Sequence, residues 1–259
     1  MKKILAIILL GTMMISMLTA CNKKKDENTF VLGLDDSFPP MGFVDENQKI
    51  VGFDIDVATE VCKRLGYELK LQPISWEAKE QELNTKNIDC IWNGLSVNPE
   101  RKEAMLLSNS YMKNNQVAVV LATSEYTRIE DLAGKTVVAQ NGSTACDAID
   151  ANASFKNSLK EVVLVSDNVK AMLDLEIGGS DAVIMDEVVA RYYMEKDGNK
   201  GKFKVLDGVL AEEEYAIAFR KEDTELCKKV NDTLKAMAED GKLAEISKKW
   251  FGKDITTIK

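Results

Sequence analysis

The sequence predicts an α/β fold, because short strand-like segments alternate with helical segments along most of the chain. Runs rich in Val, Ile, Phe and Tyr are three to six residues long, which suits strands. Strands that alternate with helices of about 10 to 15 residues indicate βαβ units and sheets with parallel strands. The predicted strands cover 30–34, 68–72, 88–92, 116–121, 136–139, 161–165, 182–185, 204–206 and 215–219.

The helical segments show apolar residues at helical spacing, followed by glycine. A glycine directly after such a segment is typical of a helix end. No internal repeat is visible. The marking residues are Ile55, Ala58, Cys62 and Leu65 before Gly66, Val169, Met172 and Leu173 before Gly178, and Val230, Leu234 and Met237 before Gly241.

Composition indicates an ordinary globular protein. The chain has 259 residues, of which 45% are hydrophobic and 29% charged, with 15 Gly and 4 Pro. These values exclude a disordered or collagen-like chain. The length suits one large domain or two lobes of about 100 to 130 residues each.

Charge and histidine content exclude several classes of function. The formal net charge of −8 argues against a nucleic-acid partner, because such partners need a basic surface. The chain has no histidine. His-based catalytic triads and His-ligated zinc or haem are therefore excluded.

The N-terminus is predicted to be a targeting segment. Residues 1–20 combine two lysines, a short apolar run and a small residue before Cys21, which is the pattern of a secretory signal peptide. The tetrapeptide ending in Cys21 resembles the lipoprotein cleavage box of bacteria, which implies a lipid on that cysteine and a tether over 21–28. The alternative is a plain signal peptide in which the cysteine is coincidental. Lipidation predicts an extracytoplasmic protein anchored to the cell membrane.

Four further cysteines show no metal-binding spacing. Cys62, Cys90, Cys146 and Cys227 contain no Cys-x-x-Cys pair. Three of them, all but Cys146, fall on apolar phases, which favours small buried side chains. An exported protein can form a disulfide, and the sequence does not specify a pair.

Polar groups follow four of the predicted strands. Ligands of open α/β sheets bind beyond the carboxyl ends of the strands, so these loops are the candidate site. They offer an arginine for a carboxylate, hydroxyls at a helix start for the same anion, and an aspartate for an ammonium group. That set is complementary to an amino-acid zwitterion. The loops are 35–40, 94–96 with Arg101 beyond, 140–144, and Asp186.

Residues 29–251 resemble the extracytoplasmic solute-binding proteins of polar amino-acid ABC transporters (family 3). The resemblance implies a type II periplasmic-binding-protein (Venus flytrap) fold, in which two α/β lobes are joined by two crossover segments, near 111–116 and 210–215. Lobe I would comprise 29–112 and 214–259, and lobe II 113–213. The matching segments, in family order, are GLDDSFPPMGF (33–43), GFDID (52–56), LG (65–66), Trp76, NGLS (93–96), ER (100–101), DLAGK (131–135), QNGST (140–144) and DAV (181–183) with Asp186.

The resemblance assigns the carboxylate end of a ligand. Arg101 occupies the position of the arginine that holds the α-carboxylate through two parallel bonds. The alternative is a solvated surface arginine. Ser143 and Thr144 match the second carboxylate contact, and the alternative for them is simple capping of the following helix.

The resemblance also assigns the ammonium end and the walls. Asp186 matches the aspartate that holds the α-ammonium, assisted by Gly94 and Ser96; the alternative is a helix cap. Phe38 and Trp76 match aromatic residues that enclose the ligand side chain, and the alternative is a core role.

Three positions bear on the ligand side chain. Asp35 matches a residue that contacts its distal end, with a turn-stabilising aspartate as the alternative. Asn93 and Gln140 depart from the common pattern. The expected ligand is a polar amino acid of the Arg, Lys, His, Gln or cystine type.

The expected function is binding without catalysis. Ligand capture between the lobes is followed by delivery to an ABC transporter permease, and the resemblance implies a monomer without cofactor or metal. Two alternatives stay open: an enzyme resembling periplasmic cyclohexadienyl dehydratases on the same scaffold, and an amino-acid sensor.

Overall fold

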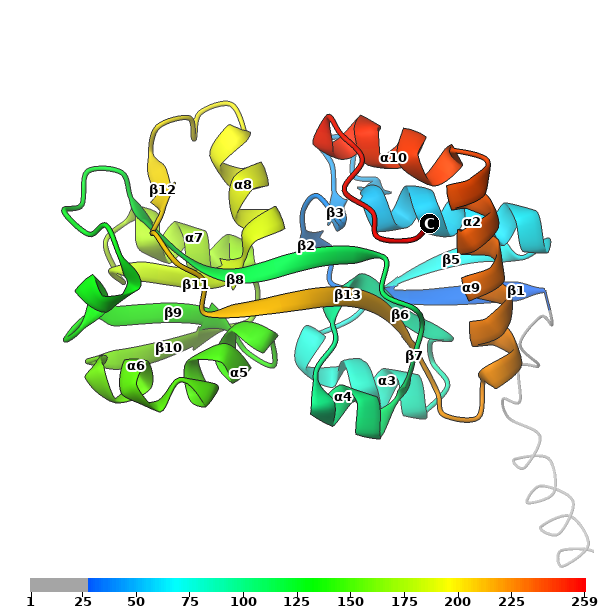
Figure 1. Ribbon diagram of the computed structural model, residues 1–259, viewed down its shortest axis with the longest axis horizontal. Coiled ribbons are helices and arrows are strands. Elements are labelled where there is room, and N and C mark those ends of the chain that lie inside the picture. Colours follow the sequence, from blue (N-terminus) through cyan, green and yellow to red (C-terminus); the bar gives the residue numbers. More distant parts are fainter. Residues whose placement is uncertain (1–27) are drawn as a thin grey trace, which may run out of the picture.

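The structure, a computed structural model, describes residues 28–259 and divides them into two α/β lobes side by side (Figure 1). The expected signal peptide, Cys21 and nearly all of the tether lie outside the described residues. Within residues 28–259, no helix is both long and apolar enough to span a membrane.

Lobe I is built around the order β5-β1-β6-β13. β1 pairs in parallel with β5 and β6, and β13 pairs antiparallel with β6. β6 is buried along its whole length, as expected for a central strand. The elements are β1 (Thr29–Leu34), β2 (Ser37–Phe38), β3 (Gly42–Val44), β4 (Ile50–Val51), α2 (Phe53–Leu65), β5 (Glu68–Pro73), the 3-10 helix η1 (Trp76–Ala78), α3 (Lys79–Asn84), β6 (Cys90–Ser96), α4 (Pro99–Ala104), β7 (Leu106–Leu107), α9 (Thr224–Glu239) and α10 (Lys242–Phe251).

Lobe II is built around the order β10-β9-β11-β8. β9, β10 and β11 are parallel, whereas β8 runs antiparallel to β11. Helices cover both faces of this sheet (Figure 1). The elements are the 3-10 helix η2 (Ile129–Leu132), β9 (Thr136–Gln140), α5 (Thr144–Ala151), α6 (Ala153–Ser158), β10 (Glu161–Val165), α7 (Asn168–Glu176), β11 (Ala182–Asp186), α8 (Glu187–Glu195) and β12 (Phe203–Val205).

Two long antiparallel strands join the lobes: β8 (Met112–Leu121) and β13 (Ala211–Phe219). Their pairing couples 112–116 to 211–215, and both strands run from one lobe into the other (Figure 1). The sequence predicts only the apolar halves of these strands, from 116 and from 215. The polar halves escape that prediction because their side chains do not alternate between apolar and polar.

Local signals explain the element boundaries. α2 ends at Gly66, whose φ of 74° is the left-handed conformation typical of a helix end. Acidic Asp54 and Asp56 lie in its first turn and Lys63 and Arg64 in its last, which complements the helix dipole. The predicted strand at 88–92 is shifted to 90–96, so its end lies at the polar loop with Ser96.

Among the cysteines of residues 28–259, Cys62, Cys146 and Cys227 form no disulfide. Cys62, Cys90 and Cys227 are buried, as their apolar phases indicated, and Cys146 is half-buried. Burial raises the pKa of Cys62 to about 12, which keeps this thiol protonated.

Candidate binding site

A small cavity lies between the lobes where β1, β6, β9 and β11 end. It holds about 270 Å³ of space outside protein atoms, part of which is open to solvent. The lining residues are the eleven that the sequence singled out: Asp35, Phe38, Trp76, Asn93, Gly94, Ser96, Arg101, Gln140, Ser143, Thr144 and Asp186.

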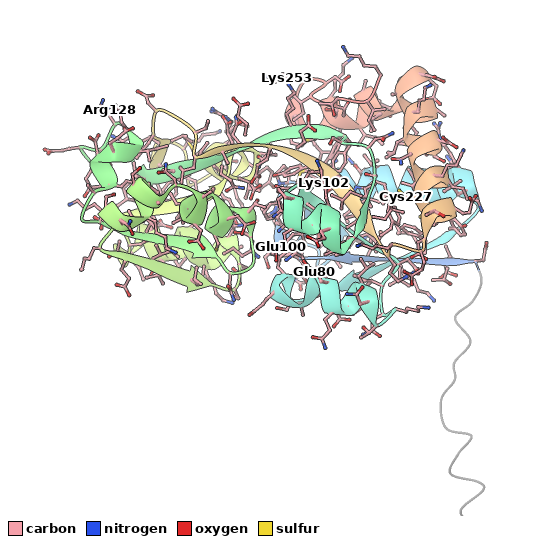
Figure 2. All side chains as sticks on the ribbon, turned by 60° about the horizontal axis from the view of Figure 1, so that its bottom comes forward. Glu80, Glu100, Lys102, Arg128, Cys227 and Lys253 are labelled. Carbon is pink, nitrogen blue, oxygen red and sulfur yellow. The ribbon has the colours of Figure 1, made fainter. Side chains whose placement is uncertain are left out.

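Arg101 provides positive charge at one end of the cavity. Its exposed fraction is 4%, although its neighbours Glu100 and Lys102 are exposed, and Figure 2 labels both. Nη1 donates to the Ser96 carbonyl (2.8 Å) and Nη2 to the Gly142 carbonyl (3.4 Å). Burial lowers the pKa of Arg101. The surface alternative is wrong, since this arginine is buried without a carboxylate within ion-pair distance in residues 28–259.

Two hydroxyls from the start of α5 face the same cavity. Ser143 is the N-cap residue of α5, but its side chain makes no capping bond. Its hydroxyl instead donates to the Gln140 carbonyl at 2.8 Å. The Thr144 hydroxyl accepts a bond from Gln116 Nε2 at 3.3 Å. Simple side-chain capping therefore does not account for either residue.

Asp186 provides a carboxylate across the cavity. It ends β11 and precedes α8, yet its side chain does not cap that helix. Oδ1 accepts bonds from Asn114 Nδ2 (2.6 Å) and the Tyr215 hydroxyl (2.7 Å). Burial, reinforced by the nearby Glu213, raises the pKa of Asp186 to about 7. The capping alternative is wrong.

Glu213 is a second carboxylate that the sequence analysis missed. Its Oε2 accepts three bonds, from the Ser96 hydroxyl (2.6 Å), Gln116 Nε2 (3.0 Å) and Asn114 Nδ2 (3.1 Å). The Ser96 hydroxyl donates its only proton to Glu213, so toward a ligand its oxygen can act only as a hydrogen-bond acceptor. Asn114 and Gln116 share one face of β8, and this spacing of two polar residues was the signal available in the sequence.

Gly94 connects the cavity to a buried carboxylate in lobe I. Its N–H donates to Asp54 Oδ2 at 2.7 Å. Its φ is +58°, and an added Cβ would lie 2.8 Å from Phe38 and 3.3 Å from Tyr215. Only glycine fits here without displacing an aromatic ring.

Asp35 belongs to both a turn and the cavity. Its Oδ1 accepts the Ser37 N–H (2.9 Å), which is the turn expected as the alternative. Its Oδ2 accepts Gln140 Nε2 from lobe II at 2.7 Å. Burial raises the pKa of Asp35. Asn93 and Gln140, the two positions that depart from the family pattern, both form hydrogen bonds with Asp35. Asn93 Oδ1 accepts the Asp35 N–H at 3.1 Å, and Gln140 donates to the Asp35 carboxylate.

Phe38 and Trp76 form the apolar walls. Their exposed fractions are 6% and 8%; Trp76 packs into a hydrophobic cluster of lobe I, and Phe38 packs into a larger cluster with residues of both lobes. Phe38 and Trp76 are therefore core residues that also line the cavity.

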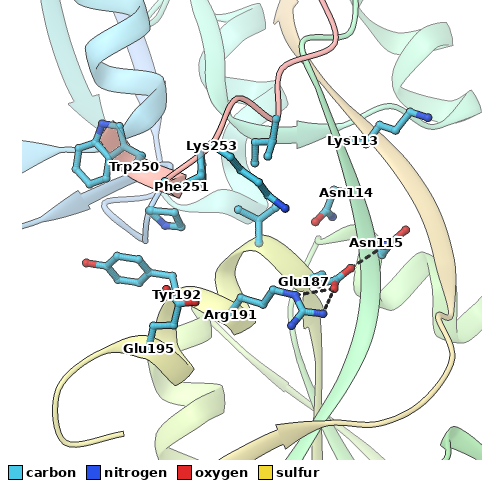
Figure 3. Close-up of a pocket in the computed structure, with 14 residues that line it drawn as sticks. Lys113, Asn114, Asn115, Glu187, Arg191, Tyr192, Glu195, Trp250, Phe251 and Lys253 are labelled. Carbon is cyan, nitrogen blue, oxygen red and sulfur yellow. Dashed lines mark hydrogen bonds and ion pairs between the residues drawn. The ribbon is translucent and has the colours of Figure 1, made fainter. Parts of the chain in front are cut away.

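A larger groove lies elsewhere between the lobes, at α8 and the end of α10 (Figure 3). Glu187 on its wall is paired, since its carboxylate accepts Arg191 Nε at 2.7 Å and Asn115 Nδ2 at 2.7 Å. Asn114 lines this groove but turns its amide N–H to Asp186. The smaller cavity is thus the one with buried charges of both signs.

The described residues contain no group of three or more Cys, Asp or Glu side chains arranged to hold a metal ion. The cavity is instead lined by one buried arginine, Arg101, and two buried aspartates, Asp35 and Asp186. This arrangement is suited to holding a small dipolar molecule by hydrogen bonds and charge.

A two-lobe α/β protein with a charged cavity between its lobes has the construction of a solute-binding protein. Residues 30–253 match the family described as bacterial extracellular solute-binding proteins, family 3. The chain belongs to this family.

Relatives and solved structures agree with this assignment. The L-cystine-binding protein TcyJ of Escherichia coli (strain K12) is 30% identical, with 91% of this chain and 87% of that protein covered. The arginine-binding extracellular protein ArtP of Bacillus subtilis is 30% identical, covering 97% and 98%. An ABC uptake transporter substrate-binding protein of Streptococcus pneumoniae, solved with bound histidine, is 41% identical, with a TM-score of 0.87 and coverage of 89% and 95%.

Proposed function

We propose that the protein binds a polar α-amino acid outside the cytoplasm and delivers it to the permease of an ABC transporter. The observation that carries this proposal is that the cavity is lined by buried groups of both charge types, Arg101 as the cation and Asp186 as a carboxylate. An α-amino acid carries one charge of each sign. Its binding would relieve the cost of burying both side chains without a counter-ion.

Each group then has a defined role. Arg101 holds the α-carboxylate together with the Thr144 hydroxyl at the start of α5, and the Ser143 hydroxyl joins them once its proton turns from the Gln140 carbonyl to the ligand. Asp186 holds the α-ammonium, and the free lone pairs of Ser96 and the Gly94 carbonyl complete that end. Two charged contacts are compatible with a micromolar dissociation constant, which corresponds to about −8 kcal/mol.

The ligand side chain is placed between Phe38 and Trp76, with its distal end near Asp35. This carboxylate favours side chains of the Arg, Lys, His, Gln or cystine type. The names of the relatives support this range, since they specify cystine, arginine and histidine.

Closure of two lobes over the ligand completes the site. We place the lobe boundaries at 112/113 and 213/214. The closed arrangement has hydrogen bonds across the gap, from Gln140 to Asp35 (2.7 Å) and from Asn98 to Asp147 (2.9 Å). Ligand favours this form through contacts that exist only when the lobes meet.

The anchoring proposal is separate. We propose that Cys21 is lipidated after cleavage of residues 1–20, which holds a monomer at the outer face of the membrane. Cys21→Ser should move the protein from the membrane fraction to the soluble fraction. Retention of this variant in the membrane would contradict the anchor.

A thermal-shift screen tests the main proposal. The chain from residue 22, unfolded and refolded to remove bound ligand, is screened against the twenty amino acids and cystine. We expect a raised melting temperature with one chemical group of amino acids, and no shift for Arg101→Ala. Absence of any shift, or turnover of prephenate or arogenate, would contradict the proposal in favour of the enzyme.

A further inference from the structure

Lys79 is a buried lysine whose charge has no counter-ion in the described structure. It begins α3 in lobe I, and its exposed fraction is 5%. Within residues 28–259, no carboxylate lies within ion-pair distance of its Nζ. Burying an ammonium group without a counter-ion costs free energy. The contacts of Lys79 indicate why it is buried.

The contacts of Lys79 lead to the cavity wall and to the opposite lobe. Nζ lies 5.2 Å from the centre of the Trp76 ring and donates to the Trp76 carbonyl at 3.3 Å. It also donates to the Gly142 carbonyl of lobe II at 3.0 Å. Lys79 itself does not line the cavity. Lys79 contacts Trp76, and Trp76 lines the cavity.

Arg101 and Lys79 share a single acceptor. Arg101 Nη2 also donates to the Gly142 carbonyl, at 3.4 Å. Two cations that bind the same oxygen atom lie close together and repel each other. Burial and the charge of Arg101 lower the pKa of Lys79 to about 8. Glu80, Glu100 and Asp147 partly compensate this positive charge, and a ligand carboxylate would compensate it further.

We propose that Lys79 is a positioning residue of this site: it joins the lobes at Gly142 and adds a second positive charge behind Arg101 for a carboxylate in the cavity. The inference rests on the proposed function. It adds that the Lys79 ammonium reaches the Gly142 carbonyl only when lobe II has closed against lobe I. Lys79 thus couples lobe closure to the presence of the ligand's negative charge.

Substitution by methionine separates charge from packing. Lys79→Met keeps a similar length and apolar stem and removes the ammonium. The matched control is Lys102→Met, because Lys102 is exposed on α4 beside Arg101. Lys79→Gln serves as a second variant if the methionine variant does not fold. The probes are the amino acid bound most tightly in the screen and the α-carboxamide of that same amino acid.

Calorimetry should show a loss of affinity for the amino acid of about 10-fold or more in Lys79→Met, because the second positive charge behind Arg101 is removed. The same variant should lose less than about 3-fold for the carboxamide, which lacks the negative charge. The melting temperature of the ligand-free variant should not fall, since an unpaired buried charge has been removed. Lys102→Met should match the unsubstituted protein in all three measurements.

Three results would overturn the inference while leaving the proposed function standing: equal affinity of Lys79→Met and the unsubstituted protein for the amino acid, equal losses for amino acid and carboxamide, or a fall in ligand-free melting temperature that accounts for the loss. Failure of the unsubstituted protein to bind any amino acid would instead overturn the proposed function, and this inference with it.

Discussion

Asp54 and Asp186 are two buried aspartates with the same chemistry and different surroundings. Burial raises the pKa of each to about 7, and each accepts a hydrogen bond from a tyrosine hydroxyl, Tyr111 for Asp54 (3.0 Å) and Tyr215 for Asp186 (2.7 Å). Asp54 also accepts the Gly94 N–H and is completely buried in lobe I. Asp186 lines the cavity.

A raised pKa therefore does not identify a binding residue in this protein. Asp54 fixes backbone that lines the cavity, whereas Asp186 presents its own carboxylate there. The two aspartates differ in exposure to the cavity: the Asp186 carboxylate lines it and can contact a ligand, whereas the Asp54 carboxylate does not line it. Substitutions at the two aspartates and at Gly94 separate these roles.

Asp186→Ala should lower ligand affinity by a factor of about 100 or more, because loss of one partner of a buried ion pair costs about 3 to 5 kcal/mol. The melting temperature of the ligand-free protein should stay close to its original value. Calorimetry with the amino acid found in the screen measures the first effect, and thermal unfolding measures the second. Unchanged affinity would remove Asp186 from the site.

Asp54→Ala should instead lower stability, by about 2 to 4 kcal/mol. The Gly94 N–H and the Tyr111 hydroxyl would be left buried without an acceptor, at about 1 to 3 kcal/mol each. Denaturant unfolding of the ligand-free protein measures this loss. A variant as stable as the original protein, but unable to bind ligand, would reverse the roles assigned to the two aspartates.

Gly94→Ala should weaken binding by about 10-fold or more, and it should lower stability more than Gly134→Ala does. The added methyl group would meet the Phe38 ring 2.8 Å away, and the left-handed backbone costs a further 1 to 2 kcal/mol or so. Displacement of Phe38 alters the cavity wall. Binding isotherms of this variant and of Gly134→Ala provide the comparison, because Gly134 is also left-handed but has open space around it.

Affinity should rise with pH up to about 7 and then level off. A ligand ammonium favours the charged form of Asp186 and lowers its pKa, so binding releases a proton below about pH 7. The limiting slope is about tenfold per pH unit. Calorimetry between pH 5 and pH 8, in two buffers that differ in ionisation enthalpy, detects the proton. A flat profile would contradict the assignment.

The same pKa shifts give the opposite trend for the ligand-free protein. The pKa of both aspartates rises from an ordinary value of 3.8 to about 7 in the folded protein. The folded state thus retains protons that the unfolded chain has released, and these two groups make stability fall as pH rises from about 4 to 7. Asp54→Asn should reduce the slope of this stability profile by about half, because Asp186 keeps its raised pKa, and should leave the pH dependence of affinity intact.

The alternation of strands and helices was predictable from sequence because buried strands and amphipathic helices leave a periodic pattern. The α/β class and the two-lobe fold are confirmed. The polar halves of β8 and β13 were not predicted. Asn114 is buried and Glu213 is half-buried, and both have polar partners, so their strand segments leave no hydrophobic periodicity.

The site was predictable where family motifs mark it. All eleven nominated residues line one cavity, whereas their roles toward a ligand stay predictions. Glu213 and Lys79 were missed because each acts across a long sequence separation, on Ser96 and on Gly142. Such pairings arise from tertiary structure and carry no local motif.

The central claim is that the cavity holds both charges of an amino acid. The most direct measurement is calorimetric titration of the unsubstituted protein with the amino acid found in the screen, its N-acetyl derivative and its α-carboxamide. The N-acetyl derivative lacks the ammonium and the carboxamide lacks the carboxylate. We predict that each derivative binds at least about 100-fold more weakly. Binding of either derivative as tightly as the parent amino acid would contradict the account.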